Sequence, residues 1–282
     1  MHQMSHNPIK VVDHSVSKET FELHFDEQYT MWRTHPKPVK DHLGAYYDSE
    51  DYISHTDGKR SLFEKIYHLV KGVMLSRKHK LVKTYASKTE TLLDIGAGTG
   101  DFLKYCKQKS WKVTGIEPNK AARQRANEKD LDVVELLAQL TGKYDVITLW
   151  HVLEHVYDLD EYISWLKEHL SENGVIIIAV PNYASYDAQY YKSFWAAYDV
   201  PRHLYHFSRQ AIQKLFKEKS LDVIATHHLP FDAYYVSLLS EKYKHGKSKI
   251  WNAFHRGWIS NYRARKSGAY SSLVYIIKHQ KK

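Results

Sequence analysis

The chain has 282 residues, of which 43% are hydrophobic, so it is long and apolar enough to bury a substantial core. No apolar run approaches the roughly 18 residues that span a bilayer, the amino end lacks an apolar signal region, and the single cysteine, Cys106, excludes an internal disulfide. The formal net charge is +9, and we expect a cytoplasmic protein.

The amino-terminal segment predicts a hairpin followed by a lid. Residues 20–25 alternate between apolar and polar as a strand does, and residues 29–34 can form the returning strand. Residues 46–58 are too polar and too aromatic for an ordinary linker, and we expect them to cover a site. From Ser61, apolar residues at helical spacing predict one helix.

Strands and helices then alternate to the end of the chain. The predicted strands cover residues 91–95, 111–116, 131–136, 145–150, 174–180, 221–227 and 272–277. Helices are predicted to begin at Thr99, Asn119 and Ser208, and at Leu153 or just before it. This alternation predicts a mainly parallel sheet with helices on both faces.

A glycine-rich turn follows the first strand of this series. Gly96, Gly98 and Gly100 have G-x-G-x-G spacing, which lets the backbone approach a ligand closely at the start of a helix. A dinucleotide fingerprint would need glycine at position 101, where the chain has Asp. The second strand ends at Glu117, which can accept hydrogen bonds from both hydroxyls of a ribose. The sequence therefore predicts a nucleoside site at this sheet edge.

Three segments, residues 94–100, 113–117 and 144–156, together make the chain resemble the class I S-adenosylmethionine-dependent methyltransferases. The Leu-Glu-His sequence after the fourth strand and Val-Pro-Asn at 180–182 are similar to the branch that includes the ubiquinone-biosynthesis O-methyltransferases. The resemblance covers about residues 60–230. It implies an α/β fold with a Rossmann-like, doubly wound, seven-stranded sheet whose last strand is antiparallel.

On this frame we predict an amino-terminal hairpin and lid (residues 1–58) and a methyltransferase domain (residues 59–282). Two insertions leave the carboxyl edge of the sheet: a roof segment at about residues 181–207 and a cap at about residues 230–271. The hairpin resembles a zinc knuckle that precedes some methyltransferases of this branch. It lacks their cysteine pairs, so we expect no metal there.

The resemblance implies S-adenosylmethionine as cofactor and S-adenosylhomocysteine as product. The residues implied to bind it lie at the carboxyl ends of four strands: Asp94, Gly96, Ala97, Gly98, Gly100, Glu117, Pro118, Leu136 and Trp150. Asp94 either pins the amides of the turn or faces the methionine amino group. The usual acid of the adenine loop is not obvious, and Glu135 is the nearest candidate. Tyr52 and His55 in the lid are candidates for the methionine carboxylate.

The segment from His151 to His155 carries the candidate catalytic residues. It fits H-x-x-E-H, a zinc-peptidase signature, but the methyl-donor motifs upstream argue against a peptidase. A neutral imidazole can take a proton from a hydroxyl near pH 7, so His151 and His155 are the predicted bases. Alternatively, Trp150 and His151 contact the cofactor only through backbone and packing, and Glu154 orients the helix.

The resemblance also bears on a metal at this segment. The ubiquinone O-methyltransferases associate a divalent cation with an acid and an acid–histidine pair at this place. Here His151 replaces the first acid, which disfavours the oxygen-seeking magnesium ion, and we predict no metal.

The roof segment contains the predicted substrate-binding residues Arg202, His203, Tyr205 and His206. We predict a small-molecule acceptor, acidic or lipid-like, and favour O-methylation. N-methylation, a nucleic-acid methyltransferase that grips with the cap, and a non-catalytic S-adenosylmethionine-binding protein are the alternatives. The absence of an Asn-Pro-Pro-Tyr signature argues against nucleic acid, and the intact glycine turn argues against a non-catalytic protein.

The carboxyl end of the chain concentrates the positive charge. Residues 242–282 hold eight Lys, three Arg and no acidic residue, which gives +11 against +9 for the whole chain. Aromatic residues are interleaved with these cations: Tyr243, Trp251, Phe254, Trp258, Tyr262 and Tyr270. The mixture fits a nucleic acid, an anionic membrane surface or an acidic substrate, and equally a solvated basic surface with its rings packed inward.

Overall fold

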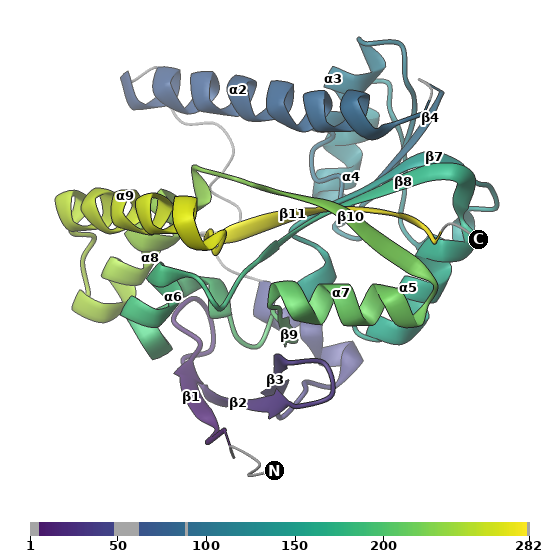
Figure 1. The fold of residues 1–282 in the computed structure, drawn as a ribbon. Coiled ribbons are helices and arrows are strands. Elements are labelled where there is room, and N and C mark those ends of the chain that lie inside the picture. Colours follow the sequence, from purple (N-terminus) through teal and green to yellow (C-terminus); the bar gives the residue numbers. More distant parts are fainter. Residues whose placement is uncertain (1–5, 48–61, 88–89, 281–282) are drawn as a thin grey trace.

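A computed structural model describes residues 6–47, 62–87 and 90–280, with only the backbone of residues 62–69. The lid candidates Tyr52 and His55 lie outside the described residues, as does the predicted domain boundary at residue 58. A seven-stranded sheet forms the centre of the molecule (Figure 1).

The central sheet confirms the predicted topology. Its order is β10-β11-β8-β7-β4-β5-β6, and β11 runs antiparallel to both of its neighbours. The strands are β4 (Thr91–Ile95), β5 (Lys112–Ile116), β6 (Asp132–Val134), β7 (Tyr144–Trp150), β8 (Leu170–Pro181), β10 (Leu221–His228) and β11 (Ser272–His279).

Helices cover both faces of this sheet, as its apolar strands require. On one face lie α2 (Leu62–Tyr85), α3 (Asp101–Lys107) and α4 (Lys120–Asn127), and on the other lie α5 (Leu159–Glu168) and α7 (Arg209–Glu218). Successive residues of β8 alternate between the two faces, so Ile177 packs with Leu103 of α3, and Ile178 packs in the cluster of α5 and α7. Cys106 is buried in the first layer, as expected of a packing residue.

The predicted helix start at Leu153 is wrong. Leu153–His155 forms a single 3₁₀ turn, η3, and α5 begins only at Leu159. The side chain of Asp158 accepts a hydrogen bond from the backbone N–H of Glu161 and so caps the helix, which begins six residues after the predicted start at Leu153. Ser208 and Asn119 cap α7 and α4 in the same way.

The predicted amino-terminal hairpin is confirmed and belongs to a second, smaller sheet. Its strands are β1 (Ile9–Val12), β2 (Thr20–Asp26) and β3 (Met31–His35), in the order β1-β2-β3-β9. The fourth strand, β9 (Tyr205–His206), comes from the roof segment and pairs with β3. The hairpin and the roof segment are therefore one structural unit, joined by backbone hydrogen bonds.

The roof segment consists mainly of short helical turns, and the cap is a pair of longer helices. The roof contains α6 (Tyr186–Tyr191), η4 (Lys192–Phe194) and η5 (Ala196–Tyr198), and the cap contains the antiparallel pair α8 (Asp232–His245) and α9 (Ile250–Ser267). Two further 3₁₀ elements are η1 (Lys40–Tyr47) and η2 (Leu137–Gln139). Among the described residues, no helix is long and apolar enough to cross a membrane.

A buried arginine holds the smaller sheet against the roof segment. The guanidinium of Arg202, which is 4% exposed, binds both carboxylate oxygens of Asp199 at 3.0 and 2.7 Å. It also donates to Asp13 Oδ1 at 3.0 Å and to the carbonyl oxygen of Tyr46 at 2.9 Å. Burial raises the pKa of Asp13, but the hydrogen bond and charge of Arg202 outweigh it and lower the pKa to about 2. These charges stabilise the fold only as a set.

We expect Arg202→Met to lower the free energy of unfolding by about 3–5 kcal/mol, because the buried charge of Asp13 and the partly buried charge of Asp199 would lose their shared partner. The matched control is Arg33→Met, which removes the exposed ion pair between Arg33 and Asp26 and should cost about 1 kcal/mol or less. Urea denaturation followed by circular dichroism measures both. Equal losses in the two variants would contradict the anchoring role of Arg202.

Candidate active site

The glycine turn connects β4 to α3 at the carboxyl edge of the central sheet. Gly96, Gly98 and Gly100 all have positive φ angles, of 74°, 55° and 78°. A Cβ atom on Gly96 would lie 2.4 Å from Val152, whereas a Cβ on Gly98 would meet no atom within 4 Å. Gly96 is thus required for packing, and Gly98 leaves open space beside the backbone where a ligand can approach.

Glu117 is locked beside this open space by two backbone amides. Gly98 N–H donates to Glu117 Oε2 at 2.8 Å, and Asn119 N–H donates to Oε1 at 2.9 Å. Each carboxylate oxygen accepts one protein hydrogen bond and keeps a further lone pair for a ligand hydroxyl. The arrangement suits a diol such as a ribose.

Asp94 lies beneath the turn and is 2% exposed. The hydroxyl of Thr148 donates to Asp94 Oδ1 at 2.6 Å. Burial raises the pKa of Asp94 to about 7, against the opposing effects of Thr148 and Lys78. Asp94 can therefore exchange a proton near neutral pH, and a cationic ligand group would favour its charged form.

Lys78 of α2 joins the site, although no sequence pattern indicated it. Its Nζ lies 4.5 Å from the ring centre of Trp150, at the end of β7, in a cation–π arrangement. Burial lowers its pKa, and the negative charges of Asp94 and Asp232 oppose that shift. The indole N–H of Trp150 is buried without a hydrogen-bond partner among the described residues.

The opposite side of the turn is the region predicted to flank an adenine. Leu136 is 57% exposed at the start of η2, and its N–H donates to Gln139 Oε1 at 2.8 Å. Arg123 donates to the carbonyl oxygens of Glu117 and Pro118 and to Glu135 Oε2 at 2.9 Å. Glu135, the nearest acid to this loop, is therefore already paired with a cation.

The two candidate bases have opposite surroundings. His151 Nε2 lies 3.0 Å from Asp232 Oδ2, and its Nδ1 lies 3.3 Å from Glu154 Oε1. Burial lowers the pKa of His151, but the hydrogen bonds and charges of Asp232 and Glu154 outweigh it and raise the pKa well above its usual range. His151 is therefore held as an imidazolium by the hydrogen bond of its Nε2 to Asp232 and by the nearby charge of Glu154, and in this state it cannot accept a proton.

His155 is neutral and keeps one free nitrogen. Its Nδ1 lies 3.1 Å from the carbonyl oxygen of Arg202 and 3.0 Å from the hydroxyl of Tyr47. Because a carbonyl oxygen can only accept, Nδ1 carries the ring proton and Nε2 keeps its lone pair. Burial and the charge of His203 lower the pKa of His155 to about 4, so its ring is uncharged at neutral pH.

Glu154, His155 and His203 form a group that could hold a metal ion. One ligand atom of each lies within 4.8 Å of the others. His203 Nδ1 donates to the carbonyl oxygen of Ala197 at 2.8 Å, so Nε2 is the nitrogen that it could offer to a metal. Glu154 is 1% exposed, and neither of its carboxylate oxygens has a hydrogen-bond partner among the described residues. Two imidazoles and one carboxylate suit a transition metal better than magnesium, which prefers oxygen ligands.

The predicted substrate-binding residues are buried side chains with partners inside the protein. Arg202 belongs to the anchor described above, His206 Nε2 lies 3.0 Å from the hydroxyl of Thr34, and Tyr205 donates to the carbonyl oxygen of Tyr157 at 3.1 Å. His203 is 8% exposed. The structure thus brings these four together as the scaffold of the roof segment, and their contact with an acceptor stays a prediction.

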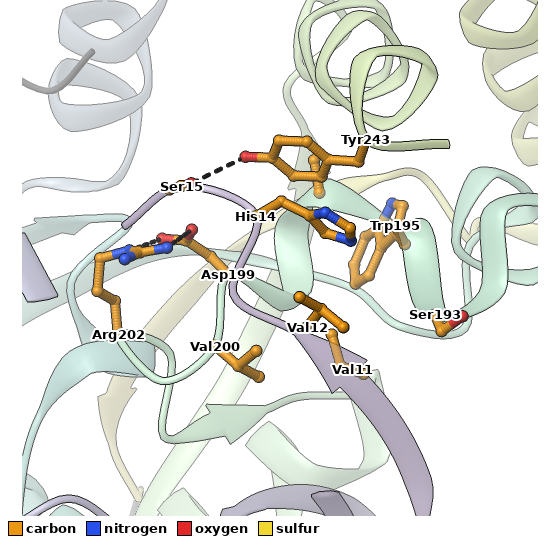
Figure 2. Close-up of a pocket in the computed structure, with 11 residues that line it drawn as sticks. Val11, Val12, His14, Ser15, Ser193, Trp195, Asp199, Val200, Arg202 and Tyr243 are labelled. Carbon is orange, nitrogen blue, oxygen red and sulfur yellow. Dashed lines mark hydrogen bonds and ion pairs between the residues drawn. The ribbon is translucent and has the colours of Figure 1, made fainter. Parts of the chain in front are cut away.

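Figure 2 shows a small cleft between β1, the roof segment and α8, with Arg202 in its lining; none of the predicted cofactor residues lines it. The Arg202–Asp199 pair forms one wall, and a hydrogen bond of 3.0 Å between Ser15 and Tyr243 crosses its edge. Because Arg202, Asp199, Ser15 and Tyr243 are bonded to partners inside the protein, this cleft is part of the anchor rather than of the site.

Three residues complete the site from segments distant in sequence: Lys78 from α2, Asp232 from the first turn of α8, and Tyr47 from η1. Each is a single polar residue within an otherwise ordinary helix or turn. The one sequence signal was indirect, because the cap and the lid were expected to start at the edge of the site.

Both the sequence and the fold have known relatives. A family model described as a methyltransferase domain matches residues 66–226, more than half of the chain. The ubiquinone biosynthesis O-methyltransferase of Caulobacter vibrioides is 32% identical over 103 residues, which are 33% of this chain and 41% of that protein. The enzyme of the same name from Rickettsia typhi is 29% identical over 143 residues, 46% of this chain and 57% of that protein.

The chain thus covers less than two thirds of the length of these relatives. Among solved structures, magnesium protoporphyrin IX methyltransferase from Synechocystis has a TM-score of 0.57 at 16% identity, with 86% of this chain and all of that chain covered. At this identity the likeness is one of fold.

The raised pKa of Asp94 predicts that stability falls as pH rises from about 4 to 7. The folded state holds this proton more tightly than the unfolded state, so ionisation in that window favours unfolding, by up to about 4 kcal/mol. Asp94→Asn removes the effect. Urea denaturation of both proteins across this window measures the difference, and parallel pH profiles for wild type and variant would contradict the assignment.

Proposed function

The chain belongs to the methyltransferase domain family, as its sequence predicted, and we propose that it transfers a methyl group from S-adenosylmethionine to a hydroxyl group of a small molecule. One observation carries the proposal. The open backbone at Gly98 and the two-amide lock on Glu117 lie side by side at the carboxyl ends of β4 and β5. In an open α/β sheet this edge is where a nucleoside ligand binds.

The described residues fit the donor. Glu117 would hold the ribose hydroxyls, and the exposed Leu136 would contact the adenine. The turn from Gly96 to Gly100 would wrap the methionine part, with Asp94 opposite its amino group. When bound, the donor supplies a sulfonium methyl group that is already activated for transfer. The chain's own residues then have to align the acceptor and exclude water.

His155 is the residue that we assign to remove the hydroxyl proton. It is neutral, its Nδ1 proton is directed to the carbonyl oxygen of Arg202, and its Nε2 lone pair is free. His151 is instead held as a cation between Asp232 and Glu154, where it orders the segment after β7. A hydroxyl acceptor requires a base, so the presence of the neutral His155 favours O-methylation. The naming of the curated relatives as O-methyltransferases points the same way.

Binding of the donor tests the proposal directly. We expect Glu117→Ala to weaken S-adenosylmethionine binding at least about tenfold, because hydrogen bonds to a charged carboxylate are lost. Gly98→Arg should abolish binding, since a side chain fills the open space at a φ of 55°. Isothermal titration calorimetry measures both, with the exposed Glu172→Ala as matched control. A wild-type protein that shows neither heat nor thermal shift with donor or with S-adenosylhomocysteine would overturn the proposal.

Measurements of the rate of methyl transfer distinguish the roles of the two histidines. We expect His155→Gln to lower kcat about a hundredfold while the donor Kd is unchanged, because only proton removal is lost. His151→Gln should cost less, since its nitrogens are already bound to carboxylates. The measurement is transfer of label from methyl-labelled donor to a panel of catechols and other hydroxyl compounds. A large loss in His151→Gln with none in His155→Gln would move the base to His151.

A further inference from the structure

The outer face of α9 carries four large aromatic side chains that the site does not use. Trp251, Phe254, Trp258 and Tyr262 are 88%, 57%, 56% and 54% exposed. Their spacing of three, four and four residues places them on one face of the helix, which we call the aromatic stripe. In Figure 1, α9 lies at the periphery of the molecule. A contiguous exposed apolar face of this kind indicates an interaction surface.

The packing of α9 fixes the stripe outward. The opposite face consists of small buried residues, Ala253, Gly257, Ser260 and Ala264. A Cβ atom on Gly257 would lie 2.7 Å from the ring of Tyr234 and 3.1 Å from the carbonyl oxygen of Ala233, so α8 and α9 approach too closely for larger side chains. The sequence left open a basic surface with its aromatic rings packed inward, and this is wrong for the four rings of the stripe. Tyr243 and Tyr270 do pack inward, against His14 and His228.

Cations flank the stripe at both ends. Lys247 precedes α9, and Arg265 and Lys266 lie in its last turn, all three exposed. Residues 242–280 contain no acidic residue. Two other arginines, Arg256 and Arg263, lie over the rings of Tyr190 and Tyr186 at 4.1 and 4.4 Å, so their charge is directed toward α6.

We propose that the aromatic stripe docks onto the surface of an anionic lipid bilayer. Trp and Tyr side chains are favoured at the level of the lipid headgroups, where an apolar ring is buried and a polar tip stays wet. A helix with an apolar face and flanking Lys and Arg lies in the plane of this interface, held by buried apolar area and by attraction to anionic lipids. The complementary charge thus selects an anionic membrane as the occupant.

The stripe fits single-stranded nucleic acid less well. Stacking of bases needs open ring faces along a basic groove. Here the rings of Trp258 and Tyr262 stack on each other, with centres 5.4 Å apart, and Arg256 and Arg263 are engaged by tyrosines. The stripe lies on the outer face of one helix, which suits a planar surface.

The cap also connects this surface to the site. α8 packs along α9 and begins at Asp232, whose carboxylate holds His151. Docking of α9 would therefore bring a bilayer to the segment that covers the acceptor side. Resting on the proposed function, this placement assigns the acceptor to the hydroxyl compounds that partition into lipid.

Vesicle sedimentation tests the docking. We expect the wild type to bind phosphatidylcholine vesicles that contain a quarter phosphatidylglycerol, and to bind pure phosphatidylcholine vesicles much less, with binding weakened by added salt. The double variant Trp251→Ser with Trp258→Ser should lower the partition coefficient at least about tenfold. The matched control is Val39→Ser, which removes an apolar side chain that is 62% exposed outside the stripe and should bind as the wild type does.

Three results would overturn the docking. They are equal vesicle binding by the wild type and the double variant, stripe-dependent binding to a single-stranded RNA oligonucleotide without vesicle binding, and a stripe-dependent dimer by light scattering. Calorimetry with S-adenosylmethionine keeps the two proposals separate. A double variant that binds donor normally has kept its fold. A wild-type protein that does not bind vesicles would overturn the docking alone. A wild-type protein that does not bind donor would overturn the proposed function.

Discussion

The parallel pairing of β4 with β5 is the constraint on which the site depends. Ile95 pairs with Ile116, so both strands end at the same level. The carbonyl oxygen of Ile116 then accepts from Gly96 and Ala97, and Glu117 receives the amide of Gly98. The strand register therefore fixes the turn and the acid together. A shift of one residue would separate them and turn each side chain to the other face of the sheet.

Buried ionic contacts hold the roof segment and the smaller sheet in place. Arg202 joins two carboxylates from segments far apart in sequence, and its carbonyl oxygen fixes the proton of His155. The backbone of Glu154 accepts from Leu204, which ties the turn after β7 to the roof segment. The same scaffold that positions the neutral imidazole thus makes the roof rigid. Burying these charges is tolerable only because each has its partner.

The order and type of the main elements could be predicted because hydrophobic periodicity and glycine placement are local signals. The strand at residues 91–95 was predicted to the residue, and the hairpin was correct. The start of α5 was not, because a capping side chain at Asp158 competed with apolar spacing. Short pairings such as β9 with β3 carry no local signal, since they depend on where a long segment returns.

The sequence by itself determined the doubly wound sheet, the meeting of Gly98 and Glu117 at one edge of it, and the family. These follow from contacts between residues close in sequence or from strand ends that must meet at one edge. Only the tertiary structure decided that His151 lies against the carboxylate of Asp232 while His155 bonds to a backbone carbonyl oxygen, that Arg202 is an anchor, and that the aromatic rings of α9 face outward. Charge state and exposure depend on partners that folding brings from distant segments, and no local pattern records them.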